Sequence, residues 1–179
     1  MPKQLPKIYF KKCYVDSILP SRKMDDDVGE DVYIHHATQY EQNTEIETPI
    51  ITERSIGFTA DKKEEEIEVF SIEPQETVVC YLGFATAIPT THYGTIVPRS
   101  GLASKFHLTI TNTPATIDPN YRGEWGAIVT NLGKKPVKLR LKMRIAQLII
   151  RNRVQYERIE VDTLPESDRG SKKFGSSGY

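Results

Sequence analysis

The stretch GAIVTNLGKKPVKLRLKMRIAQLII, residues 126–150, contains three short strand patterns separated by turns. In its middle part, residues 136–141, apolar side chains alternate with Lys138 and Arg140. This period of two is typical of a strand with one buried face and one solvated face. The turn at 131–136 carries Asn, Gly and Pro and is too short for a helix that crosses between parallel strands. The stretch therefore predicts antiparallel strands joined by tight turns.

The same pattern extends over most of the chain. A helix is predicted for residues 100–106, SGLASKF, with Ser100 as its N-cap and with Leu102 and Phe106 on one face. The expected fold class is all-β, as an antiparallel sandwich, jelly roll or barrel with one short helix. We predict strands at 67–72, 76–82, 94–97, 126–130, 136–141, 145–150 and 154–161.

Length and local composition predict the domain organisation. Residues 1–179 are expected to form a single domain, because 179 residues with 38% hydrophobic side chains suit one compact core. Residues 35–66 are polar, charged and weakly periodic, which indicates an insertion on the surface. Residues 168–179 are rich in Gly and Ser, which predicts a flexible C-terminal arm.

Charge and cysteine content narrow the classes of function. Lys and Arg together number 24, as do Asp and Glu, so no overall positive field attracts a nucleic-acid backbone or an anionic membrane. Cys13 and Cys80 are far apart in the sequence, which argues against a disulfide scaffold or a zinc site and favours a reducing compartment. The most apolar run, residues 78–88, is shorter than the roughly 20 residues of a membrane-spanning helix. We expect a soluble cytoplasmic protein that binds neither nucleic acid nor membrane.

Residues 98–101, PRSG, have the chemistry of an anion site. Ser100 and a backbone N–H at the helix start lie beside Arg99, and Gly101 adds no side-chain bulk, so several donors can converge on a phosphate. The simpler interpretation is that Ser100 only caps the helix.

Residues 112–121 form a turn-rich segment between two strand patterns, as in a wide hairpin that offers backbone groups to a flat ligand. Asp118 could orient a water or accept a hydrogen bond from a sugar hydroxyl, and the ring of Tyr121 could pack on the sugar. Taken singly, Asp118 is also a common turn residue.

Two further features have a polar and a structural interpretation. Gln147 stands among apolar residues of a predicted strand, where its amide could hold a water or a phosphate oxygen or could serve a structural partner. The tail around Arg169 and Phe174 has the composition of a lid over a phosphorylated aromatic ligand, although isolated tails of this kind are usually disordered.

Five segments follow one another in a specific order: VGEDVY (28–33), VPRSGLASK (97–105), TIDPNYRGE (116–124), RIAQLII (144–150) and RGSKKFGSSG (169–178). Together they resemble the signature motifs of the trimeric dUTPase family, the deoxyuridine triphosphate nucleotidohydrolases. The resemblance implies a distorted jelly-roll-like β-barrel that cleaves dUTP to dUMP and pyrophosphate by water attack on the α-phosphorus. This activity limits uracil in DNA and supplies dUMP for thymidylate synthesis. The resemblance further implies Mg²⁺ held mainly by substrate phosphates and water, without a direct protein ligand, and a homotrimer with shared active sites.

The resemblance also implies roles for single residues. The implied catalytic residues are Asp118, which would orient the attacking water, and Ser100, Gln147 and Asp31. Tyr121 would stack on the deoxyribose, and the arm at 168–179 would close over the nucleotide as a lid. The residues implied to bind the substrate are Arg99, Gly101, Asn112, Ala115, Thr116, Ile117, Tyr121, Gly126, Arg169, Phe174, Gly175, Ser176 and Ser177.

The chain departs from the family pattern at four positions. Ala115 and Lys173 stand where glycines are usual, which could crowd the uracil hairpin or change lid closure. Val28 and Glu30 replace the usual Ala and aromatic residue of the first motif, so the role of Asp31 is the least well supported.

Two alternative functions remain beside dUTP hydrolysis. The related dCTP deaminases, including their bifunctional members, carry a catalytic Glu on the strand after the Ile-Asp-Pro, where this chain reads GAIVTN. A nucleotide-sensing regulatory protein would keep the pocket and bind a protein partner through the insertion at 35–66, although so polar a segment is more often a solvated decoration. His35 and His36 are not expected to share a ligand, because adjacent residues of a strand point to opposite faces.

Overall fold

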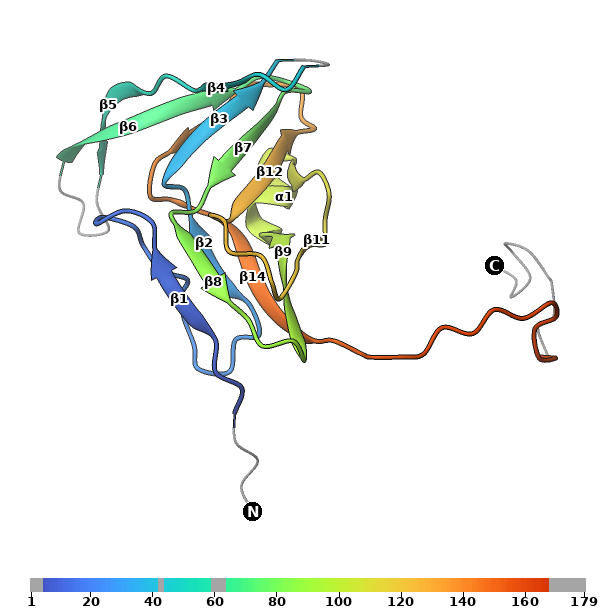
Figure 1. Cartoon of the computed structure of the whole chain (residues 1–179). Coiled ribbons are helices and arrows are strands. Elements are labelled where there is room, and N and C mark those ends of the chain that lie inside the picture. Colours follow the sequence, from blue (N-terminus) through green and yellow to red (C-terminus); the bar gives the residue numbers. More distant parts are fainter. Residues whose placement is uncertain (1–4, 42–43, 59–63, 168–179) are drawn as a thin grey trace.

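The computed structural model describes residues 5–41, 44–58 and 64–167 (Figure 1). Within these residues the chain forms fourteen strands and one helix. In chain order the elements are β1 (Tyr9–Lys12), β2 (Glu30–Tyr33), β3 (His36–Tyr40), β4 (Glu47–Pro49), β5 (Glu53–Phe58), β6 (Glu64–Ile72), β7 (Thr77–Tyr81), β8 (Phe84–Ala87), β9 (His92–Pro98), α1 (Ser100–Phe106), β10 (Leu108–Ile110), β11 (Ala115–Ile117), β12 (Gly126–Asn131), β13 (Val137–Arg140) and β14 (Arg144–Asn152).

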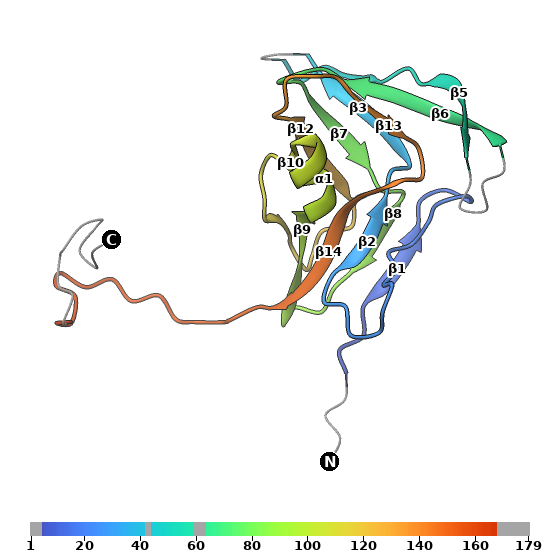
Figure 2. The same ribbon diagram turned by 180° about the vertical axis from the view of Figure 1, so that it is seen from behind.

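The described strands form four antiparallel sheets. The largest has the order β10-β12-β7-β3-β4, and a four-stranded sheet has the order β11-β9-β14-β2. Two smaller sheets have the orders β13-β6-β5 and β1-β8. From behind, β14 runs between β9 and β2, and α1 lies beside β10 (Figure 2). The predicted all-β class with one short helix is confirmed.

One apolar core connects these sheets. Val32 and Leu148 enter it from the four-stranded sheet, Val78 and Val129 from the five-stranded sheet, and Leu139 from β13. Each of these side chains is at most 1% exposed. Residues from distant parts of the sequence therefore stabilise one another through burial of apolar surface.

Trp125, immediately before β12, is the largest fully buried side chain of the core. Its backbone N–H donates to Phe84 O at 2.9 Å, and its indole Nε1–H donates to Thr86 Oγ1 at 3.2 Å. The ring lies directly over Gly94 of β9, where a Cβ atom would come within 2.3 Å of the Trp125 Cη2 atom. The indole thus fits here because residue 94 has no side chain.

The strand predicted at 154–161 is wrong. These residues form no strand, and together with the residues up to Ser167 they extend away from the body (Figure 1). Their apolar side chains are exposed, including Val154 at 78% and Ile159 at 71%. The alternating pattern is present in the sequence, but no described strand of the same chain pairs with this segment.

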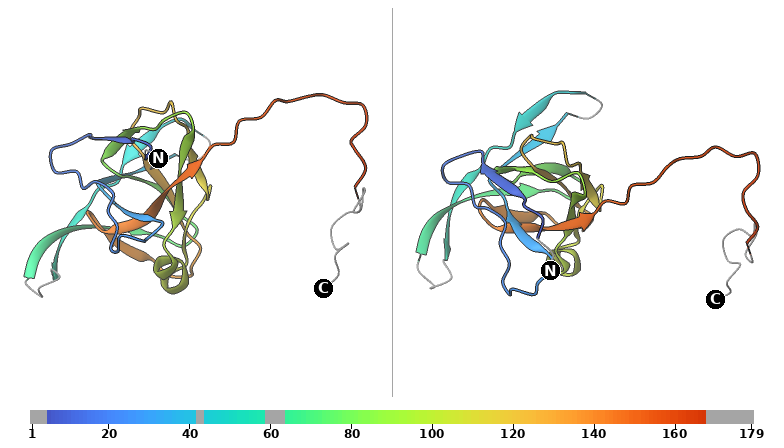
Figure 3. Two further views of the ribbon diagram at one scale, coloured as in Figure 1. Left: turned by 90° about the horizontal axis from the view of Figure 1, so that it is seen from below. Right: turned by 60° about the horizontal axis from the view of Figure 1, so that its bottom comes forward.

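The helix cap and the insertion also differ from the predictions. The N-cap of α1 is Arg99, which makes no side-chain cap hydrogen bond, and Ser100 is the first helical residue. Within the segment predicted as an insertion, β3 lies inside the five-stranded sheet between β7 and β4, and Ala37 and Thr38 are buried. The hairpin of β5 and β6 does project from the body, as Figure 3 shows. No helix of the described residues is long and apolar enough to cross a membrane.

We predict that Gly94→Ala destabilises the fold, because the added methyl group and the Trp125 ring cannot occupy the same space. The free energy of unfolding should fall by about 1–3 kcal/mol, as is usual for overpacking of a core. Chemical denaturation measures this loss. The matched control is Gly101→Ala, because a Cβ at Gly101 meets no atom within 4 Å. Equal stability of both variants would contradict the close contact.

Candidate active site

The strands β2, β14 and β9 lie side by side and collect residues from three of the sequence motifs. Gln147 of β14 is in register with Asp31 of β2 on one side and with Val97 of β9 on the other. Arg99 and Ser100 follow directly after β9. The structure therefore brings Asp31, Gln147 and Arg99 together at one end of this sheet.

Asp31 is the centre of an ion-pair network at this end. The Arg99 Nε–H donates to Asp31 Oδ1 at 2.9 Å, and the Arg144 Nη1–H donates to Asp31 Oδ2 at 2.8 Å. A weaker contact of 3.4 Å joins Arg99 Nη1 to the carbonyl oxygen of Arg144. Asp31 itself is only 8% exposed. Since charge-assisted hydrogen bonds to a largely buried carboxylate are strong, this network fixes both guanidinium groups.

Arg144 is a functional candidate that sequence reasoning missed. It opens the RIAQ motif three residues before Gln147, so the signal was present. With Arg99 and Arg144 positive and Asp31 negative, the three side chains carry a net charge of one positive unit. This local positive charge suits a phosphate, even though the formal net charge of the whole chain is zero.

Ser100 and Gly101 form the first turn of α1, and both are exposed. The Arg99 carbonyl oxygen already accepts from the N–H groups of Leu102 and Ala103, each at 3.0 Å. Beside Gly101 the surface is open, because a Cβ atom there would meet nothing within 4 Å. A ligand can therefore approach the backbone of this turn closely.

The segment from β10 to β11 crosses between the two large sheets, because β10 pairs with β12 and β11 pairs with β9. Asn112 lies in the connection, which also contains the cis peptide bond between Thr113 and Pro114. Ala115, the residue that replaces a usual glycine, is 5% exposed and belongs to the apolar core. Its φ is not positive, so the backbone here accepts a methyl group without strain.

Residues 118–125 form the loop between β11 and β12, which we call the Asp118 loop. Asp118 and Tyr121 are both exposed on it. The Tyr121 hydroxyl donates to Glu124 O at 2.9 Å, and Arg122 Nη1 donates to the carbonyl oxygens of Pro119 at 2.7 Å and of Tyr121 at 2.9 Å. These bonds define the shape of the loop without using the Asp118 carboxylate.

A single chain does not bring Asp118 and Ser100 together. Ile117 pairs with Gly94 near the start of β9, so Asp118 follows at that end, whereas Ser100 comes after the opposite end. At about 3.3 Å per residue, the strand separates the two groups by roughly 20 Å. Thr116 lies with Ile117 on β11, and Gly126 lies at the start of β12.

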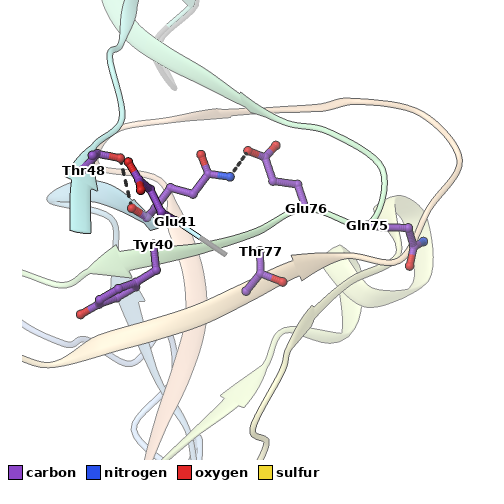
Figure 4. A pocket seen from close by; sticks show the side chains of 7 residues that line it. Tyr40, Glu41, Thr48, Gln75, Glu76 and Thr77 are labelled. Atoms are coloured by element: carbon purple, nitrogen blue, oxygen red, sulfur yellow. Dashed lines mark hydrogen bonds between the residues drawn. The ribbon is translucent and has the colours of Figure 1, made fainter. Parts of the chain in front are cut away.

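A polar hollow of about 490 Å³ lies elsewhere, between β3, β4 and the turn before β7 (Figure 4). In it the Gln39 amide donates to the Glu76 carboxylate at 2.8 Å. It contains none of the predicted site residues. Its lining residues are Gln39, Tyr40, Glu41, Thr48, Gln75, Glu76 and Thr77.

Five predicted substrate-binding residues lie outside the described part of the chain. They are Arg169, Phe174, Gly175, Ser176 and Ser177. Across residues 5–41, 44–58 and 64–167, no three His, Cys, Asp or Glu side chains are grouped so that they could hold a metal ion.

The dUTPase family model matches residues 66–178, which include the second to the fifth motif. The chain belongs to the dUTPase family. The deoxyuridine 5'-triphosphate nucleotidohydrolase of Beijerinckia indica subsp. indica is 44% identical over 108 residues, 60% of this chain and 68% of that protein. The corresponding enzyme of Orientia tsutsugamushi strain Ikeda is 47% identical over 110 residues, 60% of this chain and 72% of that protein.

The fold agrees with solved dUTPase structures. The Staphylococcus bacteriophage 80alpha dUTPase with dUPNHPP has a TM-score of 0.72 and 23% identity, covering 97% of this chain and 99% of that chain. The dUTPase of phage phi11 of S. aureus has a TM-score of 0.65 and 19% identity, covering 88% of this chain and 97% of that chain. The predicted jelly-roll-like dUTPase fold is confirmed.

We predict that Asp31→Asn lowers the stability of this dUTPase family member, because it removes the charge that compensates Arg99 and Arg144. The free energy of unfolding should fall by about 1–3 kcal/mol, the usual cost of losing a charged hydrogen-bond partner. Urea denaturation measures this loss. Arg54→Gln is the control, since it breaks an exposed pair with Glu66 that is worth about 0–1 kcal/mol. Unchanged stability of Asp31→Asn would show that the network does not hold this corner together.

Proposed function

We propose that this chain hydrolyses dUTP to dUMP and pyrophosphate through the residues described above. The observation that carries the proposal is the family match over residues 66–178, which spans Arg99, Asp118 and Gln147. The relatives named above are nucleotidohydrolases of the same substrate. The deaminase alternative is not favoured, because β12 carries no carboxylate where such an enzyme needs one.

The phosphate chain binds at the end of the sheet that carries Asp31. Ser100 and Gly101 contact the α- and β-phosphates through the open first turn of α1. Arg99 stabilises the charge that grows on the leaving oxygen, and Asp31 holds its guanidinium in position at 2.9 Å. Gln147, in register with Asp31, places a phosphate oxygen or a water.

The nucleoside binds at the segment from Asn112 to Tyr121. Backbone groups of Asn112, Ala115, Thr116 and Ile117, together with those near Gly126, read the edge of uracil. Tyr121 packs on the deoxyribose at the place where a ribose 2′-hydroxyl would collide. Asp118 orients the attacking water, and its exposed carboxylate is free of the hydrogen bonds that shape the loop.

Mg²⁺ fits this chain as an ion carried by the substrate. Both oxygens of Asp31 already accept from arginines, so this carboxylate is better suited to hold cations of the protein than to ligate a metal. Mg²⁺ prefers oxygen ligands and retains waters, and the phosphates of dUTP supply such ligands. When bound, it neutralises charge on the phosphate chain.

The active form is a homotrimer whose sites are shared between subunits. Two features support this assembly: the strand length that separates Asp118 from Ser100, and the extended segment after β14 with its exposed apolar side chains. One chain would supply Asp31, Ser100 and Gln147, and a neighbour would supply Asp118 and Tyr121. The arm at 168–179, with Arg169, Phe174, Gly175, Ser176 and Ser177, would close the site as a lid. None of these residues lies in the segment 35–66, whose binding to a protein partner stays a prediction.

Asp118→Asn should lower the rate of pyrophosphate release from dUTP by about 10²–10⁴-fold, the usual contribution of a group that activates water. Binding of dUTP should stay within about threefold, because the substitution removes a contact made mainly in the transition state. The assay supplies Mg²⁺ with dUTP, dCTP, dTTP or UTP and follows pyrophosphate and ammonia. Asp25→Asn is the control for an exposed aspartate. Ammonia from dCTP, or undiminished hydrolysis by Asp118→Asn, would contradict the proposal.

Shared sites predict complementation between two inactive variants. Asp118→Asn and Ser100→Ala chains, expressed together, should regain about a quarter of wild-type activity, because one site in four combines an intact Asp118 with an intact Ser100 from a neighbour. Each variant expressed alone should stay inactive. The measurement is pyrophosphate release at equal total protein. Activity no higher than the mean of the separate variants would refute the exchange of residues between chains.

A further inference from the structure

Four aromatic rings form a cluster beside the Asp118 loop, those of Tyr14, His35, His36 and Tyr81. The Tyr14 and His35 rings stack with centroids 4.1 Å apart, and the His36 and Tyr81 rings stack at 4.7 Å. The two imidazoles meet edge to face at 5.5 Å. Their Nδ1 atoms are 3.2 Å apart. The expectation that His35 and His36 would point to opposite faces is wrong, because His35 lies in the connection before β3 and not within a strand.

The hydrogen-bond partners of this histidine pair determine where its protons lie. His35 Nε2 lies 3.1 Å from Asp16 Oδ1, and since a carboxylate only accepts, this nitrogen carries the hydrogen. In a neutral imidazole the other nitrogen then has a lone pair. His36 Nδ1–H must therefore donate to His35 Nδ1. The neutral pair has one arrangement of its protons.

Glu124 connects the pair to the Asp118 loop. Its Oε1 accepts from the backbone N–H of Gly83 at 2.8 Å, and its Oε2 accepts from the Tyr14 hydroxyl at 3.1 Å. The same Oε1 lies 4.0 Å from His36 Nδ1. The carbonyl oxygen of Glu124 accepts from the Tyr121 hydroxyl at 2.9 Å. Glu124 is thus bound on one side to the β7–β8 turn and the segment after β1, and on the other to the residue proposed to pack on the sugar.

We propose that Glu124 is a positioning residue for Asp118 and Tyr121. We further propose that the His35–His36 pair adjusts Glu124, because the His36 Nδ1–H can donate either to His35 or to Glu124. The inference deepens the proposed function and rests on the roles given there to Asp118 and Tyr121. Glu124 touches no substrate and acts through the loop.

One added proton changes the partner of His36. When His36 is protonated, its positive ring is attracted to the Glu124 carboxylate, whose Oε1 lies 4.0 Å from His36 Nδ1. The His36 Nδ1–H then turns from His35 Nδ1 towards Glu124 Oε1, which already accepts from Gly83. The Glu124 carboxylate then gains a charged partner, and its hydrogen bond with the Gly83 N–H of the β7–β8 turn is weakened or shifted. Because the Tyr121 hydroxyl is bound to the same residue, the sugar side of the loop moves with it.

Burial favours the neutral form of His36 in the folded protein. The pKa of His36 lies below its ordinary value of 6.5, because burial disfavours the charged ring; Glu124 and Glu47 oppose this effect, and His35 adds to it. A histidine whose pKa is lower when folded gives stability above pH 6.5, and this stability is lost as the pH falls from 6.5 towards the folded pKa. The charged and titratable groups that surround the pair are Cys13, Tyr14, Asp16, Glu47, Tyr81, Glu124 and Lys142.

The test combines three variants with two measurements. Glu124→Gln keeps the size of the side chain and removes its charge, His36→Gln removes the titrating ring, and His92→Gln is the control for an exposed histidine outside the cluster. The first measurement is kcat/KM for dUTP and for UTP between pH 5.5 and 8. The second is the fluorescence of Trp125, the single tryptophan of the chain and the neighbour of Glu124, over the same range without nucleotide.

We expect Glu124→Gln to lower kcat/KM for dUTP by about tenfold at pH 7.5 and to reduce the preference for dUTP over UTP, as a loss of positioning does. The substrate phosphates also titrate near pH 6, so the informative quantity is the ratio of variant to wild type at each pH. For His36→Gln this ratio should change with pH below 6.5, whereas for His92→Gln it should stay constant. The Trp125 fluorescence of the wild type should change over the same range, and His36→Gln should abolish the change.

An unchanged kcat/KM and an unchanged preference for dUTP over UTP in Glu124→Gln would refute the positioning role. A loss in His36→Gln by the same factor at every pH, with the Trp125 titration retained, would refute the moving hydrogen bond. If the wild type releases no pyrophosphate from dUTP, the proposed function fails. The fluorescence titration then still decides whether the histidine pair acts on the loop, since it needs no substrate.

Discussion

The strand β9 sets the main geometric constraint of this molecule. It pairs with β14 along one edge and with β11 along the other, so residues of three sequence motifs are placed relative to one strand. The same strand keeps Asp118 and Ser100 at its opposite ends. Gly94, near its start, leaves the space that the buried Trp125 ring fills. Core packing and the separation of Asp118 from Ser100 therefore depend on the same seven residues.

Electrostatics in this chain are local. The protein has equal numbers of acidic and basic side chains, and the end of the sheet that carries Asp31 obtains positive charge from two arginines around this one carboxylate. The Asp31 carboxylate therefore mainly binds and orients these two arginines. The surroundings of Glu124 differ, because its carboxylate accepts from two neutral donors, the Tyr14 hydroxyl and the Gly83 N–H. The His36 ring, whose charge depends on pH, lies 4.0 Å away.

Much of the fold could be predicted from the sequence, since the pattern of 136–141 and the short turns around it directly reflect a half-buried antiparallel strand. The strand at 154–161 could not be assessed in this way, because a strand needs a partner and the described part of the chain supplies none. The position of β3 was missed for another reason. His36–Tyr40 lies near a sheet edge and carries polar residues, so its pattern resembles that of a loop.

Candidate site residues could be predicted from the sequence where the motif itself indicates the chemistry of the side chain. Residues whose role depends on contacts with distant parts of the chain were harder to predict. Arg99, Asp118 and Gln147 could be proposed as site residues from their motifs, and their roles stay predictions. The predicted role of Ser100 as the helix cap was wrong, because Arg99 takes the N-cap position. Arg144 was overlooked because its importance comes from Asp31, more than one hundred residues earlier in the chain. The contact of His35 with His36 depends on a bend between two strands, which no periodicity shows.

The extended segment after β14 makes folding of the body independent of the burial of this segment. The last described strand ends at Asn152, so every described strand pairing and every described core contact is made without this segment. Folding of the body is thus a first-order process within one molecule. Val154, Tyr156 and Ile159 stay exposed when the body has folded, and only contact with another surface would bury them. The rate of such an encounter would rise with protein concentration, whereas the rate of folding would not.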